Sequence, residues 1–242
     1  MEIIICKDYN DMSKVASNII CDEINKNPKL TLGLATGNTP VGTYEHLINL
    51  YKENKIDFSN IKAFNLDEYY GLSKDDIQSY SYFMREKLFN HININIENTH
   101  IPNGVPLNII EECKNYDSLI DSNGGIDLQI LGIGSNAHIA FNEPSNVFKL
   151  GTSLVDLKES TIKDNSIYFD KMEDVPTQAI SMGIGSIFKA NKIILLASGK
   201  SKAKAIYDTI NREIDPNIPS SILKLHKNVI FILDEDSASM LK

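Results

Sequence analysis

The chain has 242 residues, 42% of them hydrophobic and 23% charged, which is typical of a globular protein with a buried core. Its net charge is −8, and no run of lysine or arginine could follow a phosphate backbone, which excludes nucleic acid as a main partner. No stretch approaches the ~20 apolar residues of a membrane span, so we expect no membrane partner.

The three cysteines are odd in number and widely scattered. They show no metal-ligand spacing, and they suggest a reducing compartment. The apolar run at the N-terminus is too short for a signal peptide. We therefore expect a cytoplasmic protein, and because no linker-like segment interrupts the chain, we expect a single domain over residues 1–242.

Short β-rich runs alternate with longer amphipathic stretches along the chain. The expected strands are Glu2–Cys6, Leu30–Ala35, Ile61–Leu66, Ile126–Gly132, Lys192–Ala197 and Asn228–Leu233. The expected helices include Asp11–Asn27, Val41–Glu53, Ser79–Phe89, Leu107–Asp121 and Lys200–Arg212. Mostly apolar strands indicate burial on both faces, and their alternation with helices favours an α/β fold with a mainly parallel sheet. Working residues of such folds collect beyond the carboxyl ends of the strands.

The first unusual strand end is the segment LGLATGNTPVGTYEHL, Leu32 to Leu47. Gly37 permits a tight turn, and Pro40 suits the start of a helix because its missing N–H is not needed there. Free amides at that helix start, together with the hydroxyls of Thr36 and Thr39, would favour a phosphate. The alternative is an ordinary capped turn. No Gly-Lys-Ser/Thr follows, so this is not a Walker loop.

The second strand end, in FNLDEYYGL, carries two adjacent carboxylates, Asp67 and Glu68. Neighbouring side chains leave a strand in opposite directions, so the two are not expected to share one role. One of them, facing a pocket, could serve as a general base. The alternative is a turn with a capping aspartate.

The third strand end, GIGSNAHIAFNEP, begins like a dinucleotide-binding fingerprint. That fingerprint needs a helix after its glycines, and Pro144 follows Ala137 too closely to leave room for one, so we reject the dinucleotide interpretation. What remains is His138 and Glu143, with Asn136 and Asn142 beside them. A histidine with a nearby carboxylate is a common proton shuttle, although a lone histidine is often structural. Two ligands without a further cluster do not support a metal site.

Five segments in order resemble the glucosamine-6-phosphate deaminase family, also called glucosamine-6-phosphate isomerases. They are LGLATGNTPVGTYEHL, FNLDEYYGL, LGIGSNAHIAFNEP, VPTQAISMGIGSIFKANKIILLASGKSKA and LKLHKNVIFIL. The likeness covers essentially the whole chain. It implies a Rossmann-like three-layer α/β/α sandwich that converts glucosamine 6-phosphate to fructose 6-phosphate and ammonia, without a metal or redox cofactor.

The resemblance also implies roles for particular residues. Asp67 matches the base that moves a proton between C2 and C1 of the opened sugar, and His138 matches the histidine that helps to open the ring. Glu143 matches its acidic partner, and Asn136 lies where members carry Asp or Asn. The phosphate-binding positions are Thr36, Gly37, Asn38, Thr39 and Lys202.

Three positions depart from the family pattern. Ala137 replaces a usual glycine, which costs strain if the position needs a positive φ. Ile167 and Gly151 stand where arginines are usual, so phosphate capture or sugar preference should change unless Lys149 or Lys163 supplies the contact.

Four functions are therefore open: a deaminase of glucosamine 6-phosphate, one of an isomer such as galactosamine 6-phosphate, a 6-phosphogluconolactonase, and a non-catalytic sugar-phosphate sensor. The chain resembles the family's shorter members, so we expect a monomer or small homo-oligomer.

Overall fold

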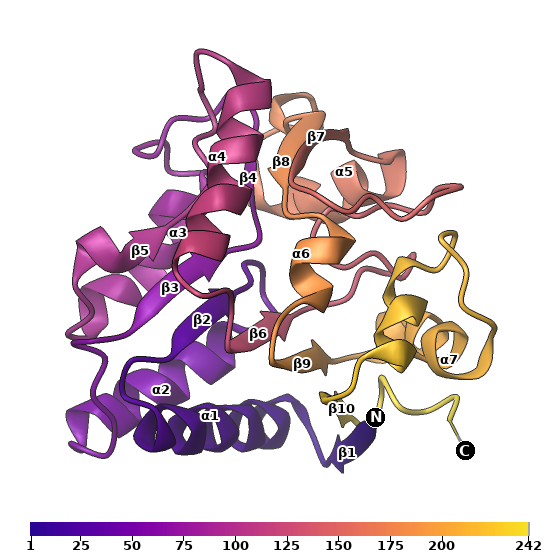
Figure 1. Cartoon of the computed structure of the whole chain (residues 1–242). Coiled ribbons are helices and arrows are strands. Elements are labelled where there is room, and N and C mark those ends of the chain that lie inside the picture. Colours follow the sequence, from indigo (N-terminus) through magenta and orange to yellow (C-terminus); the bar gives the residue numbers. More distant parts are fainter. Residues whose placement is uncertain (242) are drawn as a thin grey trace.

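A seven-stranded sheet forms the centre of the computed structural model, which describes residues 1–241 (Figure 1). Its strand order is β1 (Glu2–Cys6), β10 (Val229–Asp234), β9 (Lys192–Ala197), β6 (Leu128–Leu131), β2 (Thr31–Leu34), β3 (Lys62–Asn65) and β5 (Thr99–His100). Every pairing in this sheet is parallel. The predicted mainly parallel sheet is confirmed, as are all six predicted strands. The two-residue strand β5 was not predicted.

Helices cover both faces of the sheet, as Figure 1 shows. One face carries α1 (Tyr9–Lys26), α2 (Val41–Lys52) and α3 (Tyr80–Lys87), and the other carries α4 (Ile109–Ser122), α6 (Ile184–Phe188) and α7 (Ala203–Asn211). The predicted three-layer α/β/α sandwich is confirmed. The last predicted helix begins three residues late because Lys200–Lys202 forms a 3-10 turn, η5, after Gly199.

The inner strands are largely apolar because they supply both layers of the core, whereas the edge strand β1 is mostly exposed. In β9, Ile194 and Leu196 pack with the helices α1 and α2. Their neighbours Ile193 and Leu195 pack with α6 and α7 on the opposite face. Successive side chains of a strand point to opposite faces, so a strand between two helical layers must be apolar at every position.

A second, antiparallel sheet of three short strands lies beyond the central one and was not predicted. It consists of β4 (Asp67–Tyr69), β8 (Gln178–Ser181) and β7 (Ser153–Asp156). The short helix α5 (Glu159–Asn165) follows β7. Tyr69 and Phe141 belong to a small apolar cluster beside this sheet. β4, with the sequence DEY, and β7, with the sequence SLVD, lack the apolar run that identified the strands of the central sheet.

The strand order reverses between β2 and β6. From β2 the chain proceeds to β3 and β5 on one side, whereas β6, β9 and β10 lie on the other. Loops that leave neighbouring strands at such a switch point diverge to opposite faces, and a crevice opens between them. The carboxyl ends of β2 and β6 lead directly into the two loops that the sequence singled out.

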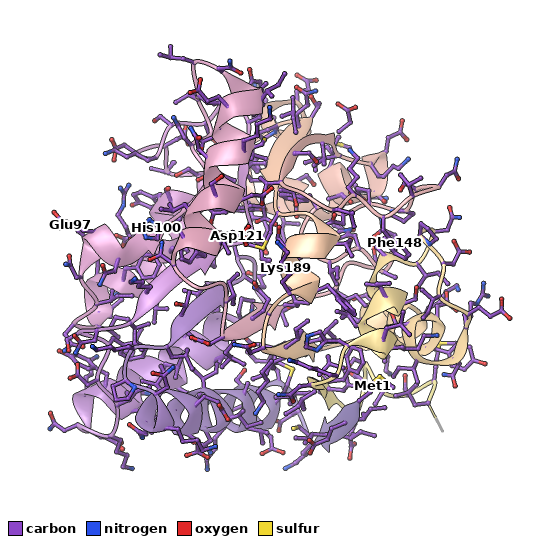
Figure 2. All side chains as sticks on the ribbon, in the orientation of Figure 1. Met1, Glu97, His100, Asp121, Phe148 and Lys189 are labelled. Carbon is purple, nitrogen blue, oxygen red and sulfur yellow. The ribbon has the colours of Figure 1, made fainter. Side chains whose placement is uncertain are left out.

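An exposed ion pair joins two helices of the second helical layer. Lys189, after α6, lies 3.4 Å from the Asp121 carboxylate of α4 (Figure 2). Both side chains are exposed, so solvent screens the pair and its contribution to stability is small.

Within residues 1–241, no helix combines the length and apolar character needed to cross a membrane.

Candidate active site

A cavity of about 570 Å³ opens at the switch point, between the carboxyl ends of β2, β6 and β9 and the start of β4. Seven of the nine predicted site residues line it: Thr36, Gly37, Asn38, Thr39, Asp67, His138 and Lys202. The other two, Asn136 and Glu143, lie outside the lining and contact His138. A somewhat larger cavity, of about 640 Å³, lies beside Glu68 and contains none of the nine.

Asp67 is the first residue of β4 and pairs with Ser181 of β8. It is 5% exposed, and its carboxylate accepts no hydrogen bond from the part of the chain that the structure describes. Burial, and then the charge of neighbouring Glu68, raise the pKa of Asp67 to about 8. A carboxyl group without partners, at the wall of a cavity, is well suited to exchange a proton with a ligand.

Glu68 faces away from that cavity, as the alternation along a strand predicts. Its carboxylate accepts hydrogen bonds from the backbone N–H groups of Tyr80 (2.8 Å) and Ser81 (2.9 Å) in the first turn of α3, and from that of Tyr69 (2.9 Å). Burial outweighs these donors and raises the pKa of Glu68 to about 7. The N-cap of α3 is Ser79, whose hydroxyl accepts from the Tyr82 N–H, so Asp67 does not take the capping role that the sequence left open. Glu68 accepts from the first-turn N–H groups beside that cap and ties β4 to α3.

His138 and Glu143 form a pair on the β6 side of the cavity. His138 Nδ1 lies 3.6 Å from Glu143 Oε2, and the two side chains are 17% and 7% exposed. Asn136 Nδ2 donates to the same carboxylate oxygen at 2.8 Å, while Thr161 Oγ1 and the Lys158 N–H donate to the other. Glu143 is thus held on several sides with one oxygen toward the imidazole.

The charge state of Glu143 follows from these contacts. Burial alone would raise the pKa of Glu143, but His138, Thr161 and Asn136 together outweigh burial and hold that pKa below its ordinary value. A carboxylate that remains ionised can stabilise an imidazolium next to it. This arrangement can orient His138 and support its protonation during a reaction.

The glycines of GIGSNAHIAFNEP shape a turn rather than the start of a helix, because no helix occurs between Gly132 and Pro144. A Cβ at Gly134 would lie 2.3 Å from the His138 ring, so only glycine leaves room for the imidazole. The rejection of a dinucleotide site is consistent with this loop, whose Gly134 N–H donates to the His138 carbonyl at 2.9 Å.

Ala137, which stands where the family usually has glycine, has a positive φ of 67°. The position is therefore strained for a residue with a Cβ. An L-residue in this region costs about 1–2 kcal/mol. We expect Ala137→Gly to stabilise the fold by roughly 0.5–1 kcal/mol, after the entropy of the unfolded glycine is subtracted. Ala190 is buried without a positive φ, so Ala190→Gly should destabilise instead. Urea unfolding measures both, and a similar destabilisation by the two variants would contradict strain at Ala137.

The loop Thr36–Thr39 lines the cavity after β2, and Gly37 has a φ of 89°. The expectation that α2 begins with free amides needs correction. The Val41 N–H donates to the Asn38 carbonyl at 3.3 Å, and the Gly42 N–H donates to the Tyr9 hydroxyl at 2.7 Å. These two donors are satisfied inside the protein, so an anion here would depend on the loop's own amides and hydroxyls.

Lys202 follows β9 and reaches the cavity from η5. Burial lowers the pKa of Lys202, and the nearby carboxylate of Asp164 partly opposes that shift. The turn before it is fixed by Asp234, which accepts hydrogen bonds from Ser198 Oγ (2.5 Å) and the Gly199 N–H (3.0 Å). Lys202 is therefore presented by an ordered turn.

The two missing arginine positions have different surroundings. Ile167 lines the cavity and is 72% exposed to solvent. Gly151 is not part of the lining, and a Cβ there would lie 2.9 Å from an Asp117 carboxylate oxygen. Of the two lysines named as replacements, Lys163 lines the cavity and Lys149 does not.

Several residues of the site were missed by sequence analysis. Thr161, on α5, donates to Glu143, and Ser135 Oγ donates to the Asp164 carboxylate at 2.8 Å. Tyr80 and Phe141 add aromatic walls to the cavity. Single hydroxyls and aromatic residues carry no local pattern, so only the fold reveals these contacts. Within residues 1–241, no group of three or more His, Cys, Asp or Glu side chains could hold a metal ion.

A parallel sheet covered on both faces, with an acid–base cavity at its switch point and a lysine in that cavity, defines a Rossmann-like enzyme for a small anionic substrate. The model of the family described as glucosamine-6-phosphate isomerases/6-phosphogluconolactonase matches residues 9–232. The chain belongs to this family.

Similar proteins support the same assignment. Glucosamine-6-phosphate deaminase from Clostridium novyi is 57% identical over 241 residues, covering 100% of both chains. The protein of that name from Clostridioides difficile is 55% identical over 241 residues, covering 100% of this chain and 97% of its own. A solved monomeric glucosamine-6-phosphate deaminase is 43% identical with a TM-score of 0.97, covering 99% of this chain and 100% of its own. The 6-phosphogluconolactonase from Trypanosoma brucei shares the fold, with a TM-score of 0.77 at 20% identity, covering 100% and 98%.

Proposed function

We propose that residues 1–242 act as one domain that converts glucosamine 6-phosphate to fructose 6-phosphate and ammonia. One observation carries the proposal: a single cavity is lined by the partner-free carboxyl group of Asp67, by His138 with Glu143 behind it, and by Lys202. The full-length identity to proteins called glucosamine-6-phosphate deaminase supports it.

The first chemical step is ring opening. His138 removes the proton of the C1 hydroxyl while the bond from C1 to the ring oxygen breaks, and it then passes that proton to the ring oxygen. Glu143 stabilises the charge that the imidazole acquires, and Asn136 holds Glu143 in position. Lys202 and the loop Thr36–Thr39 bind the phosphate and so fix the sugar in the cavity.

The second step is the isomerisation. Asp67 removes the proton from C2 while the C1 carbonyl oxygen takes up a proton from water, which gives an enolamine, and the same carboxyl group then returns its proton to C1. The resulting C2 imine is hydrolysed to the ketose and ammonia. His138 serves the proton transfer of ring opening and Asp67 serves those of the isomerisation, so we propose that the reaction needs no metal or redox cofactor.

The other functions are less well supported. The likeness to 6-phosphogluconolactonases is at 20% identity and concerns the fold alone. A sensor has no use for a carboxyl group whose pKa is raised to about 8 beside a histidine–carboxylate pair. A deaminase of galactosamine 6-phosphate would use the same chemistry, because that substrate differs from glucosamine 6-phosphate only in the configuration at C4. We further propose a cytoplasmic enzyme that is a monomer or small homo-oligomer, since a similar solved deaminase is described as monomeric.

Ammonia release by the purified protein tests this function. We expect turnover of glucosamine 6-phosphate, at least tenfold slower turnover of galactosamine 6-phosphate, and none of unphosphorylated glucosamine at the same concentration. Preference for the galactosamine compound would replace the proposed substrate with its C4 epimer. Release from neither phosphate, in protein that unfolds cooperatively, would overturn the proposal.

A further inference from the structure

The cations of the cavity are few in relation to the charge of a phosphate. A phosphate monoester carries about −1.5 to −2 charges at pH 7. Among residues 1–241, Lys163 and Lys202 are the lysines that line the cavity, and no arginine does. Asp164 also lines it and lies close enough to Lys202 to influence its pKa. Lys202 and Asp164 together are nearly neutral, so Lys202 alone cannot balance the phosphate.

Lys163 is placed where it can supply the missing charge. It lies in the last turn of α5, and the 3-10 turn Ser166–Tyr168 continues from that helix. Residues four apart on a helical segment share one face, so Lys163 and Ile167 are neighbours, and both line the cavity. Thr161 is buried on the side of α5 that faces Glu143.

The ammonium group of Lys163 is uncommitted. It forms no ion pair and no side-chain hydrogen bond with the residues that the structure describes, although several other lysines do. Ile167 beside it presents an aliphatic side chain, which cannot bind an anion. A free cation on a cavity wall that is otherwise nearly neutral gives that wall its net positive charge.

We propose that Lys163 is a phosphate-binding residue, which pairs with Lys202 to hold the phosphate of the substrate from the α5 side. The inference rests on the proposed function, because that function puts a phosphate in the cavity. An ammonium group binds phosphate as a point charge on a flexible stem, without the fixed fork of an arginine. The site then recognises phosphate mainly by charge, and binding weakens with salt.

The test compares Lys163→Met with Lys171→Met, a matched change at an exposed lysine that does not line the cavity. We expect the KM of Lys163→Met for glucosamine 6-phosphate to rise about tenfold, with kcat within about twofold, because a charge-assisted hydrogen bond is lost. Lys171→Met should retain both values. Adding Ile167→Arg to Lys163→Met should lower the KM again, because it returns a cation to the same helical face.

A second measurement separates this inference from the proposed function. Inorganic phosphate should raise the Tm of the unmodified protein and of Lys171→Met, and should raise that of Lys163→Met far less. This result would support the phosphate contact even if no amino sugar were turned over. An unchanged KM in Lys163→Met together with a full Tm response to phosphate would overturn the role of Lys163.

Discussion

Asp67→Asn should abolish the exchange of the substrate's C2 proton and reduce kcat by about 10²–10⁴-fold, while KM changes little. A positioned acid–base group contributes a factor of this size, and an asparagine can neither take up nor return the proton. Asparagine has nearly the same shape as aspartate, and Asp67 makes no hydrogen bond within the described residues that the change would break. Ammonia release and incorporation of solvent deuterium measure the two effects.

The pH dependence of the unmodified enzyme follows from the same group. A general base works only when ionised, and the pKa of Asp67 is raised to about 8 by burial and by Glu68. kcat/KM should therefore fall about tenfold for each pH unit below 8 and level off above it. A plateau that extends down to pH 5 would contradict the assignment of Asp67 as the base.

Loss of activity in Asp67→Asn must be distinguished from loss of structure. The pH dependence of the protein's stability distinguishes them, because the pKa of Asp67 differs between the folded and unfolded states. The Asp67 carboxyl is ionised above about pH 4 when unfolded but retains its proton up to about pH 8 when folded. The fold therefore binds the extra proton, and the contribution of Asp67 to stability is present below pH 4 and is lost as the pH rises to 8. The asparagine variant should thus have the higher Tm at pH 8 and about the same Tm near pH 4. A variant that is inactive and also less stable at pH 8 would leave Asp67 with a structural role only.

The sequence was most informative where the fold is regular. The strands Glu2–Cys6 and Lys192–Ala197 were predicted with the bounds that the structure gives. Burial on both faces explains the apolar run of Lys192–Ala197. Glu2–Cys6 is instead an edge strand in which Ile3 and Ile5 are exposed, so its apolar run alone identified it. Once the strands were placed, the rule that parallel sheets bind ligands at their carboxyl ends pointed to Thr36–Thr39, Asp67 and His138.

The rest depended on contacts that have no local signal. The strand β4, which carries Asp67, has three residues and exists because β8, more than a hundred positions later in the sequence, pairs with it. Glu68 and Asp67 are both carboxylates in one strand, and only the position of α3 decides which of them accepts hydrogen bonds from the first turn of a helix. Likewise, the Tyr9 hydroxyl accepts a hydrogen bond from the Gly42 N–H of α2, which we had expected to be available to an anion.

Glu143→Gln should lower kcat by about 10–100-fold through the ring-opening step, a smaller loss than that of Asp67→Asn. The variant keeps the side chain's size but removes the charge that stabilises a protonated His138, whose Nδ1 lies 3.6 Å away. An acyclic amino-sugar phosphate needs no ring opening, so it should bind the variant as tightly as it binds the unmodified enzyme. Glu173→Gln, at an exposed position outside the cavity, is the matched control.

The ionised carboxylate of Glu143 stabilises the fold, whereas ionisation of Asp67 destabilises it. Burial would raise the pKa of Glu143, but His138, Thr161 and Asn136 hold it below its ordinary value. Its ionised form therefore stabilises the fold above about pH 4.5, and this contribution is lost as the pH falls through the lowered pKa. Glu143→Gln should cost about 1–3 kcal/mol at pH 7 and less at pH 4, since hydrogen bonds to a charged group are lost. A stabilising Glu143→Gln at pH 7 would show instead that the charge of Glu143, like that of Asp67, is not compensated in the folded protein. The distinction between a hydrogen-bonded Glu143 and a partner-free Asp67 would then fail. That division explains the chemistry: the satisfied carboxylate remains charged to orient His138, and the unsatisfied one is free to carry the proton.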